Sequence, residues 1–516
     1  MTMEAAALAA TKPTSQLRAN FLQTLARCDD IVTARPWLVL VAFVPLWTIY
    51  AVISNGAADI HTDTAEAYSW GREMLWGYYK HPPFWSWIAH GWFAVFPISS
   101  WSAYLLSTVN VALGLYFARR VAAYFLPDAA SQWSAALVLG LMPVYTFLTM
   151  LFNANTIQLS VWPATAWAFL SMMDKLEPRR AALAGLLMAC ALLSKYNALL
   201  FLACLFFASL VHPNGRKFWA SSLPFFATLG FLPLTLMHFW WLVQNNFLPF
   251  HYFHSEELYP YARSIPSAFG FLVAMVLYTL PALLTLLVAA RSLRVAWPKL
   301  AMMPVLAILT FGPTASSAVA CAALQTKCSA LWGMQNLFTV PIFIITLLPA
   351  FVGAVALRRI WRVNAAFLAV TLVISPLVAV ATFEAHTRAA NSPRTELALK
   401  LTQWWHQNVG GRWKIVGGND IYSMGAAFSS PDHPVFDLNV MPLATPWINP
   451  AMAKAQGALY ICKADDALCI TAGKRAAGPQ AELLTISAAK RLWWLTAPRR
   501  NFVVVVQRPQ AAKTAS

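Results

Sequence analysis

The sequence predicts an α-helical polytopic membrane protein with about 11 transmembrane helices and a small extracytoplasmic α/β domain at its carboxyl end. Of its 516 residues, 59% are hydrophobic and only 11% are charged, whereas soluble domains carry about 25% charged residues. Apolar runs of spanning length recur up to Phe383. From residue 391 onward, charged and polar residues reach the density of a soluble protein.

The chain begins with a polar segment, residues 1–36, which contains Arg18, Arg27 and Arg35 before the first apolar run. We expect this segment to be cytoplasmic and uncleaved, with the first span acting as a signal anchor. The net charge is +17. In a membrane protein this excess is typical of cytoplasmic loops and a few site cations, so no nucleic-acid partner is expected.

Residues 37–384 are expected to form the transmembrane domain, because a span requires about 20 apolar residues. The candidate spans are 37–54, 100–118, 131–152, 156–173, 181–194, 197–211, 219–243, 266–290, 300–320, 337–357 and 364–384. Basic clusters fall at alternate connections, at Arg119-Arg120, Arg179-Arg180, Arg216-Lys217, Arg291/Arg294/Lys299 and Arg358-Arg359. The positive-inside rule then places the amino terminus inside and the carboxyl terminus outside.

The stretch 181–211 allows two interpretations, because Lys195 interrupts it. One long span would carry the basic pair Arg216-Lys217 to the outside. Two short spans keep this pair inside and place Lys195 at an outer turn, which we prefer, since short helices are tolerated where they line a protein cavity.

Residues 385–509 are expected to form a periplasmic α/β domain, and residues 510–516 a disordered tail. A helix is predicted over 394–408 from its apolar spacing. Strands are predicted at 413–418, 458–463 and 502–508, the first ending in a glycine turn. Cys321/Cys328 and Cys462/Cys469 fall in segments placed outside the cytoplasm. Two disulfides or two pairs of free thiols both fit this spacing.

The first outer loop, residues 55–99, concentrates ionisable side chains between Asp63 and His81 and mixes them with Trp and Tyr. Ionisable groups near a membrane are costly and usually have a functional or pairing role. The aromatic residues suit the membrane–water interface. We therefore expect this loop to lie on the bilayer face, with polar groups above a cavity.

This loop resembles the first extracytoplasmic loop of membrane glycosyltransferases that use polyprenyl-phosphate-linked sugars. Asp63, the run REM at 72–74 and the run YYKHPP at 78–83 carry the resemblance. The superfamily includes protein O-mannosyltransferases, aminoarabinose transferases of lipid A and rhizobial galacturonosyltransferases. The resemblance extends to the C-terminal domain, and it implies a C-type glycosyltransferase fold.

Two carboxylates of the loop are candidates for catalysis, and the resemblance supports the first of them. Asp63 aligns with the carboxylate that deprotonates or orients the acceptor hydroxyl. Its alternative role is the N-cap of a helix that begins at Thr64. Glu66 is the second candidate, and its alternative role is that of a capping box. Some relatives have a basic residue at the position of Glu66.

Four residues are candidates for binding the lipid phosphate. Lys80 and His81 precede the pair Pro82-Pro83, which restricts the backbone. Their alternative role is snorkelling at the interface. Lys195 and Tyr196 resemble the Lys-containing turn of the family near the lipid phosphate. For Lys195 the alternative is a cation at a helix end that reaches the interface.

Sugar or acceptor binding is expected from Asn153 and Asn155 in an outer turn, and from Trp332 and Gln335 in a later outer loop. Several relatives have an Asp in the first of these turns, where this chain has amides. Ordinary turn chemistry is the alternative for both Asn residues. We assign no metal ligand and no certain cofactor. A divalent metal remains an alternative, because His251 and His254 have a suitable spacing.

The sequence thus predicts a multi-pass enzyme of the bacterial inner membrane that transfers a sugar from a polyprenyl phosphate to a periplasmic acceptor, with Asp63 as base. The acceptor would be lipid A, lipopolysaccharide, another envelope glycan or a protein, and membrane lipids would surround the site. The alternative is a transporter or flippase of a lipid-linked saccharide. Transporters tend to show paired repeats, and we find no internal repeat.

Overall fold

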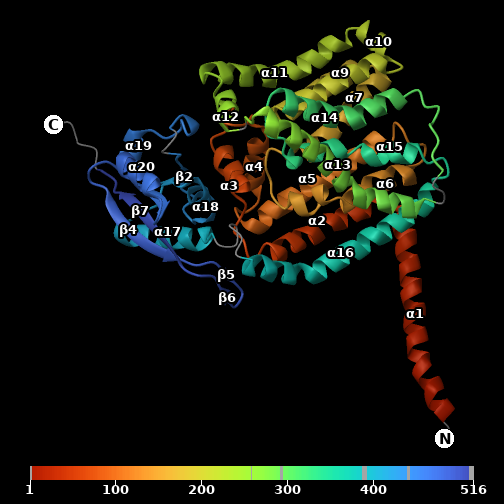
Figure 1. The fold of residues 1–516 in the computed structure, drawn as a ribbon, viewed down its shortest axis with the longest axis horizontal. Coiled ribbons are helices and arrows are strands. Elements are labelled where there is room, and N and C mark those ends of the chain that lie inside the picture. Colours follow the sequence, from red (N-terminus) through yellow and green to blue (C-terminus); the bar gives the residue numbers. More distant parts are fainter. Residues whose placement is uncertain (1–2, 257, 291–293, 386–391, 439–441, 511–516) are drawn as a thin grey trace.

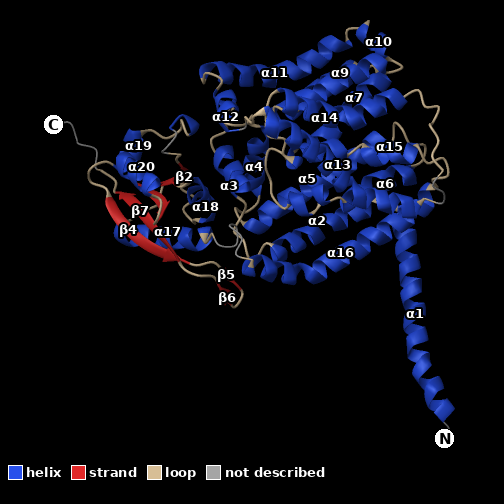
Figure 2. Ribbon diagram, in the orientation of Figure 1, coloured by secondary structure: helices blue, strands red, loops and turns tan. Residues whose placement is uncertain are grey.

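The computed structural model describes residues 3–256, 258–290, 294–385, 392–438 and 442–510, and of the predicted tail at 510–516 all but residue 510 lies outside them. A bundle of helices packs beside a smaller domain with a central sheet (Figure 1). Figure 2 shows that the strands gather in the smaller domain. Helix α1 (Met3–Ala34) projects away from the bundle. The predicted class, a helical polytopic membrane protein with a C-terminal α/β domain, is confirmed.

The long helices of the bundle are α2 (Trp37–Ser54), α5 (Ser100–Ala122), α7 (Gln158–Lys175), α8 (Pro178–Ser194), α9 (Ala198–Val211), α11 (Leu223–Gln244), α13 (Tyr261–Ala289), α14 (Met303–Ala323) and α16 (Gly353–Glu384). Shorter elements are α3 (Thr62–Gly71), α4 (Phe84–Val95), α6 (Ala129–Leu137), η1 (Val138–Leu141), η2 (Pro143–Tyr145), η3 (Phe147–Thr149), α10 (Gly215–Trp219), α12 (Leu248–Glu256), η4 (Ala330–Leu337) and α15 (Val340–Thr346). Within the described residues, six helices are long and apolar enough to cross a membrane, or seven if one bent pair counts as a span.

Local chemistry breaks the helix in two of the predicted stretches, and only the first break was not predicted. The span predicted at 131–152 bends by 91° between Leu141 and Pro143. Proline at this point cannot donate a backbone hydrogen bond to continue the helix. The stretch 181–211 forms two helices, α8 and α9, which break at Lys195 as expected.

The predicted boundary between spans 337–357 and 364–384 is wrong. Residues 340–346 form the short α15, and one continuous helix, α16, covers 353–384. Arg358, which with Arg359 suggested a connection, lies inside this helix, as does Arg362. Arg358 pairs with Asp30 at 3.6 Å, and Arg362 forms a close ion pair with the buried Asp29. Partners on α1 thus allow these charges to remain helical.

Helices α8 and α11 pack backbone against backbone. Gly185 on α8 and Gly230 on α11 face the opposite helix. A Cβ added at Gly185 would overlap the carbonyl oxygen of Ala227, and one added at Gly230 would overlap that of Ala182. Small residues allow such close approach between membrane helices. The two helices therefore hold a fixed separation.

The C-terminal domain is built on a five-stranded sheet in the order β2-β1-β3-β7-β4. Its strands are β1 (Ile415–Gly418), β2 (Val435–Phe436), β3 (Ala458–Lys463), β4 (Glu482–Ala488) and β7 (Arg500–Gln507). β1 is parallel to both β2 and β3, whereas β7 is antiparallel to β3 and β4. The other elements are α17 (Arg394–Asn408), α18 (Asp420–Ser429), η5 (Pro442–Ala444), α19 (Pro450–Gln456), α20 (Ala467–Ala477) and the hairpin of β5 (Arg491–Leu492) and β6 (Leu495–Thr496).

The predicted helix and the three predicted strands of this domain are present as α17, β1, β3 and β7. Strand β4 was not predicted, because its side chains alternate only weakly between buried and exposed. Both cysteine pairs are disulfides, Cys321–Cys328 and Cys462–Cys469. This result decides between the two alternatives that the spacing left open.

A buried ion pair joins this domain to the first outer loop. The carboxylate of Asp59 accepts hydrogen bonds from Lys490 Nζ at 2.6 Å, Thr395 Oγ1 at 2.8 Å and Thr395 N at 3.1 Å. The guanidinium of Arg394 donates to the Asp59 carbonyl oxygen at 3.1 Å. Asp59 and Arg394 are both buried. The domain is thus docked on the loop that carries the candidate catalytic residues.

Candidate active site

Asp63 lies in the first turn of α3 and contacts a turn that lies 90 positions later in the sequence. Its Oδ2 accepts a hydrogen bond from Asn153 Nδ2 at 2.8 Å. Next to it, Thr64 Oγ1 accepts from the Phe152 N–H at 3.0 Å. The alternative of Asp63 as N-cap is wrong, because His61 caps α3 by accepting from the Asp63 N–H. The Asp63 side chain keeps 41% of its surface exposed and can therefore meet a substrate.

The orientation of Asn153 follows from its other hydrogen bonds. Its Oδ1 accepts from the N–H groups of Asn155 and Thr156, each at 2.9 Å. The oxygen is thereby used, so the amide nitrogen is the atom directed at Asp63. Turn chemistry, the alternative for Asn153, is present, and the same side chain also contacts Asp63. Sugar or acceptor binding by Asn153 stays a prediction.

Glu66 and Lys80 form an ion pair at 2.7 Å, in which Glu66 is 3% exposed and Lys80 is 19% exposed. The capping-box alternative for Glu66 is therefore wrong. Lys80 also lies over the rings of Trp70 and Tyr79, 5.6 Å from each centroid. Burial raises the pKa of Glu66 to about 7, although Lys80 opposes the shift, and the charge of Asp63 adds to it. The pair positions Lys80 beside Asp63.

The raised pKa of Glu66 gives a testable pH dependence. Between about pH 4.5 and 7 the folded state holds a proton that the unfolded state has lost, so the free energy of unfolding should fall as pH rises through this window. A shift of this size corresponds to about 3 kcal/mol. Unfolding in detergent at several pH values would measure it. The matched variant Glu66→Gln should lack this component, and an unchanged slope in that variant would contradict the prediction.

His81 is near both candidate cations. Burial, together with the charges of Lys195 and Lys80, holds the pKa of His81 well below its usual range. The imidazole is therefore neutral and offers one donor and one acceptor rather than a charge. Phosphate binding by His81 stays a prediction, and it would act through a hydrogen bond.

Lys195 lies at the break between α8 and α9. Its Nζ donates to Asn155 Oδ1 at 2.6 Å and sits 4.6 Å from the ring centroid of Trp332. The backbone of Trp332 accepts a hydrogen bond from Gln335 Nε2 at 2.6 Å. Two of the predicted residues, Asn155 and Trp332, thus contact the Lys195 cation, and Gln335 binds the backbone of Trp332.

Tyr196 points to a different partner from Lys195. Its hydroxyl is 3.1 Å from His238 Nε2, and His238 Nδ1 is 2.6 Å from the carbonyl oxygen of Trp76. The carbonyl requires Nδ1 to be the donor, so Nε2 accepts from the tyrosine. These two hydrogen bonds link α11 to the first outer loop. This link was not predicted, because His238 lies within an apolar run and carries no motif.

The C-terminal domain contributes a residue that was not predicted. Asp420, the first residue of α18, is close enough for its charge to raise the pKa of Glu66. Nearby, Arg72 Nη1 donates to the carbonyl oxygen of His433 at 2.6 Å. Helices α3 and α18 lie side by side (Figure 1). Both the helical bundle and the C-terminal domain therefore contribute residues to the candidate site.

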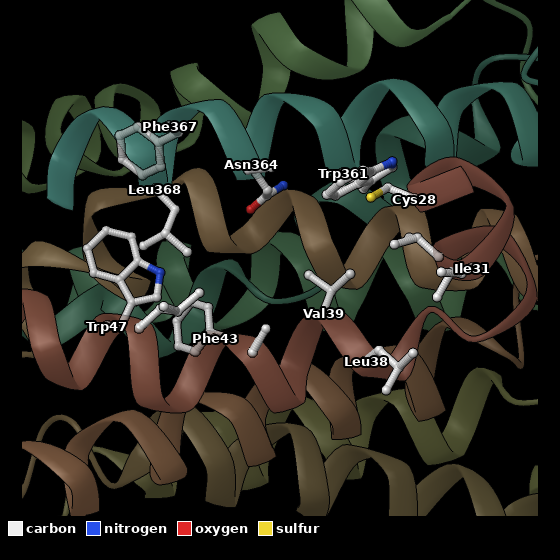
Figure 3. Close-up of a pocket in the computed structure, with 14 residues that line it drawn as sticks. Cys28, Ile31, Leu38, Val39, Phe43, Trp47, Trp361, Asn364, Phe367 and Leu368 are labelled. Atoms are coloured by element: carbon white, nitrogen blue, oxygen red, sulfur yellow. The ribbon is translucent and has the colours of Figure 1, made fainter. Parts of the chain in front are cut away.

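A separate pocket of about 300 Å³ lies between α1, α2 and α16. Figure 3 shows Phe43, Trp47, Asn364 and Phe367 facing into it. Its lining includes none of the candidate catalytic or phosphate-binding residues. In the described parts of the chain, no group of three or more His, Cys, Asp or Glu side chains could hold a metal ion.

Comparisons with known proteins agree with this architecture. Residues 80–241 match the family described as dolichyl-phosphate-mannose-protein mannosyltransferase. No curated protein matches the sequence. Two solved structures of ArnT from Cupriavidus metallidurans each cover 92% of this chain and 98% of their own. The one bound to undecaprenyl phosphate has a TM-score of 0.57 at 16% identity, and the apo form 0.49 at 17%. The resemblance to the polyprenyl-phosphate-sugar glycosyltransferase superfamily is confirmed.

Proposed function

We propose that this protein transfers a sugar from a polyprenyl-phosphate donor to a hydroxyl group of an envelope acceptor. One observation carries the proposal. A single turn positions a carboxylate and a cation, because Asn153 binds Asp63 and Asn155 binds Lys195. Transfer from a lipid phosphate needs a base on the acceptor side and a cation on the leaving-group side. The family match and the ArnT-like fold support the same reaction class.

The reaction assigns a role to each group. The Asp63 carboxylate takes the proton of the acceptor hydroxyl, whose oxygen attacks the anomeric carbon from the face opposite the phosphate. The bond between that carbon and the phosphate oxygen breaks, and polyprenyl phosphate leaves with the electron pair. Lys195 stabilises the negative charge of the leaving phosphate. The sugar is inverted at its anomeric carbon.

The same proposal places the enzyme in a bacterial inner membrane with this site on the periplasmic side. The acceptor would be lipid A, lipopolysaccharide, another envelope glycan or a protein. Two disulfides in segments expected on that side support the orientation, because disulfides persist in oxidising compartments.

A transfer assay tests the proposal. Purified protein is incubated with a panel of radiolabelled polyprenyl-phosphate sugars and envelope-lipid extracts. Label that moves to an acceptor would identify both donor and acceptor. In parallel, the protein is reconstituted in vesicles. Label that crosses the bilayer without transfer to any acceptor would refute the proposal and favour the flippase.

Replacing Lys195 with Met should weaken donor binding. A hydrogen bond to a charged group contributes about 1.5–3 kcal/mol, so the KM for the donor should rise roughly 10- to 150-fold. The KM for the acceptor should change much less. Lys175→Met is the matched control, because Lys175 is exposed at the end of α7. An unchanged donor KM in Lys195→Met would argue against a phosphate-binding role.

A further inference from the structure

The hairpin of β5 and β6 presents an aromatic pair that the proposed reaction does not use. Trp493 and Trp494 form its turn and are 52% and 81% exposed. Their ring centroids are 5.7 Å apart. Trp493 has a φ of 50°, a conformation that bulky side chains adopt rarely and that tends to mark functional sites. The turn thus projects two large rings from the domain surface.

The base of the hairpin is fixed against the membrane helices. Leu492 and Ala497 are buried in one cluster with Ala379 and Phe383 of α16. Just before the hairpin, Lys490 pairs with the buried Asp59. The hairpin is therefore held beside the end of α16 (Figure 1), which fixes the place of the turn that carries the two rings.

The end of α16 marks the level of the membrane surface. α16 is a candidate span, and its exposed apolar residues include Val373 and Leu377, at 77% and 70%. Phe383, which contacts the hairpin cluster, lies about two turns after Leu377. The tryptophans are thus located where a span leaves the bilayer. Tryptophan is enriched at this level because its ring is apolar and its N–H is polar.

The charge of the segment fits a phospholipid surface. Residues 490–500 contain four cations and no acidic residue. Lys490 is held by the buried Asp59, whereas Arg491, Arg499 and Arg500 are exposed. The side chain of Arg491 is 70% exposed, although it lies 3.9 Å from the Glu396 carboxylate. Lys and Arg near a membrane are attracted to its anionic headgroups. The hairpin thus has aromatic rings at its turn and cations at its base, and a phospholipid surface favours this arrangement.

We propose that the Trp493–Trp494 turn inserts into the headgroup region of the leaflet that the end of α16 reaches. The hairpin would anchor the C-terminal domain to phospholipid. This proposal does not depend on the sugar chemistry, so a failure of the proposed reaction would leave it intact. A protein partner or a soluble acceptor at this turn would be a different occupant, which the experiment below distinguishes.

A spin label reports directly on the surroundings of the tip. Trp494→Cys is labelled with a nitroxide in a background in which the free Cys28, Cys190 and Cys204 are replaced by Ala. The full chain is placed in nanodiscs of phosphatidylethanolamine and phosphatidylglycerol. Relaxation by oxygen, which concentrates in lipid, is compared with relaxation by a water-soluble nickel chelate. Thr496→Cys, also exposed, provides a second position on the same hairpin.

Leu483→Cys is the matched control on the same ribbon. Leu483 is 54% exposed and pairs with Val505, five positions along the ladder from the pair Ala488–Arg500. At about 3.3 Å per residue, it lies roughly 17 Å further from the hairpin. We expect the ratio of oxygen to nickel relaxation to be several-fold higher at 494 than at 483. Equal ratios, or a label at 494 shielded from both reagents by protein, would overturn the proposal.

Discussion

Replacing Asp63 with Asn is expected to reduce kcat for sugar transfer by about 10²- to 10⁴-fold, the typical contribution of a general base. The amide keeps the size of the side chain and can still contact Asn153, so α3 should remain in place. It cannot accept the proton of the acceptor hydroxyl. The loss should therefore fall on kcat, with little change in the KM for the donor.

Two further variants make this result interpretable. Asp174→Asn, at the exposed end of α7, is the matched control and should transfer at the wild-type rate. Asn153→Ala removes the hydrogen bond that positions Asp63, and should lower kcat less than Asp63→Asn does. Full activity in folded Asp63→Asn would rule out this carboxylate as the base.

Asp59→Ala is expected to destabilise the protein by about 3–5 kcal/mol, because removing one partner of a buried ion pair leaves an uncompensated charge. Lys490 and Thr395 would both lose their contacts with the carboxylate, whereas Arg394 binds the Asp59 backbone carbonyl, which the substitution keeps. Although burial would raise the pKa of Asp59, Lys490, Thr395 and Arg394 together lower it. The folded pKa is thus below the unfolded one, so this stabilisation is present at neutral pH and is lost as pH falls below about 4.

Thermal unfolding and amide hydrogen exchange in the C-terminal domain would measure the effect. Glu482→Ala is a suitable control, because its ion pair with Arg508 lies on the surface and should contribute less than about 1 kcal/mol. Equal destabilisation in the two variants would show that the Asp59 contact does not secure the domain. Faster exchange confined to α17 and β4 in Asp59→Ala would locate the damage at the domain contact.

Regular elements were predictable from the sequence where their pattern is local. The helix over 394–408 and the strand over 458–463 have the predicted bounds, because their apolar spacing needs no distant partner. Helix α16 was divided wrongly, since its arginines resemble a cytoplasmic connection. What keeps them helical is Asp29 and Asp30, more than 300 positions away in the sequence.

The site was predictable in its residue types but not in its pairing. The contact between Asp63 and Asn153 joins residues 90 positions apart, and a capping role for Asp63 fitted the local sequence equally well. Glu66 gave the same ambiguity, and its pairing with Lys80 excludes the capping role, whereas its catalytic role stays a prediction. His238 and Asp420 carry no motif, and only the packing of α11 and α18 brings them to the site.

The glycine contact between α8 and α11 has a consequence for changing what this protein accepts. Lys195 follows the last residue of α8, and His238 lies on α11. Because the two helices are in close backbone contact, Lys195 and His238 can move only together. These residues thus form a rigid wall of the proposed site. A bulkier sugar or acceptor must be accommodated by the opposite wall, which consists of α3 and α18. Chimeras that exchange the C-terminal domain are therefore a better route to new specificity than substitutions along α8.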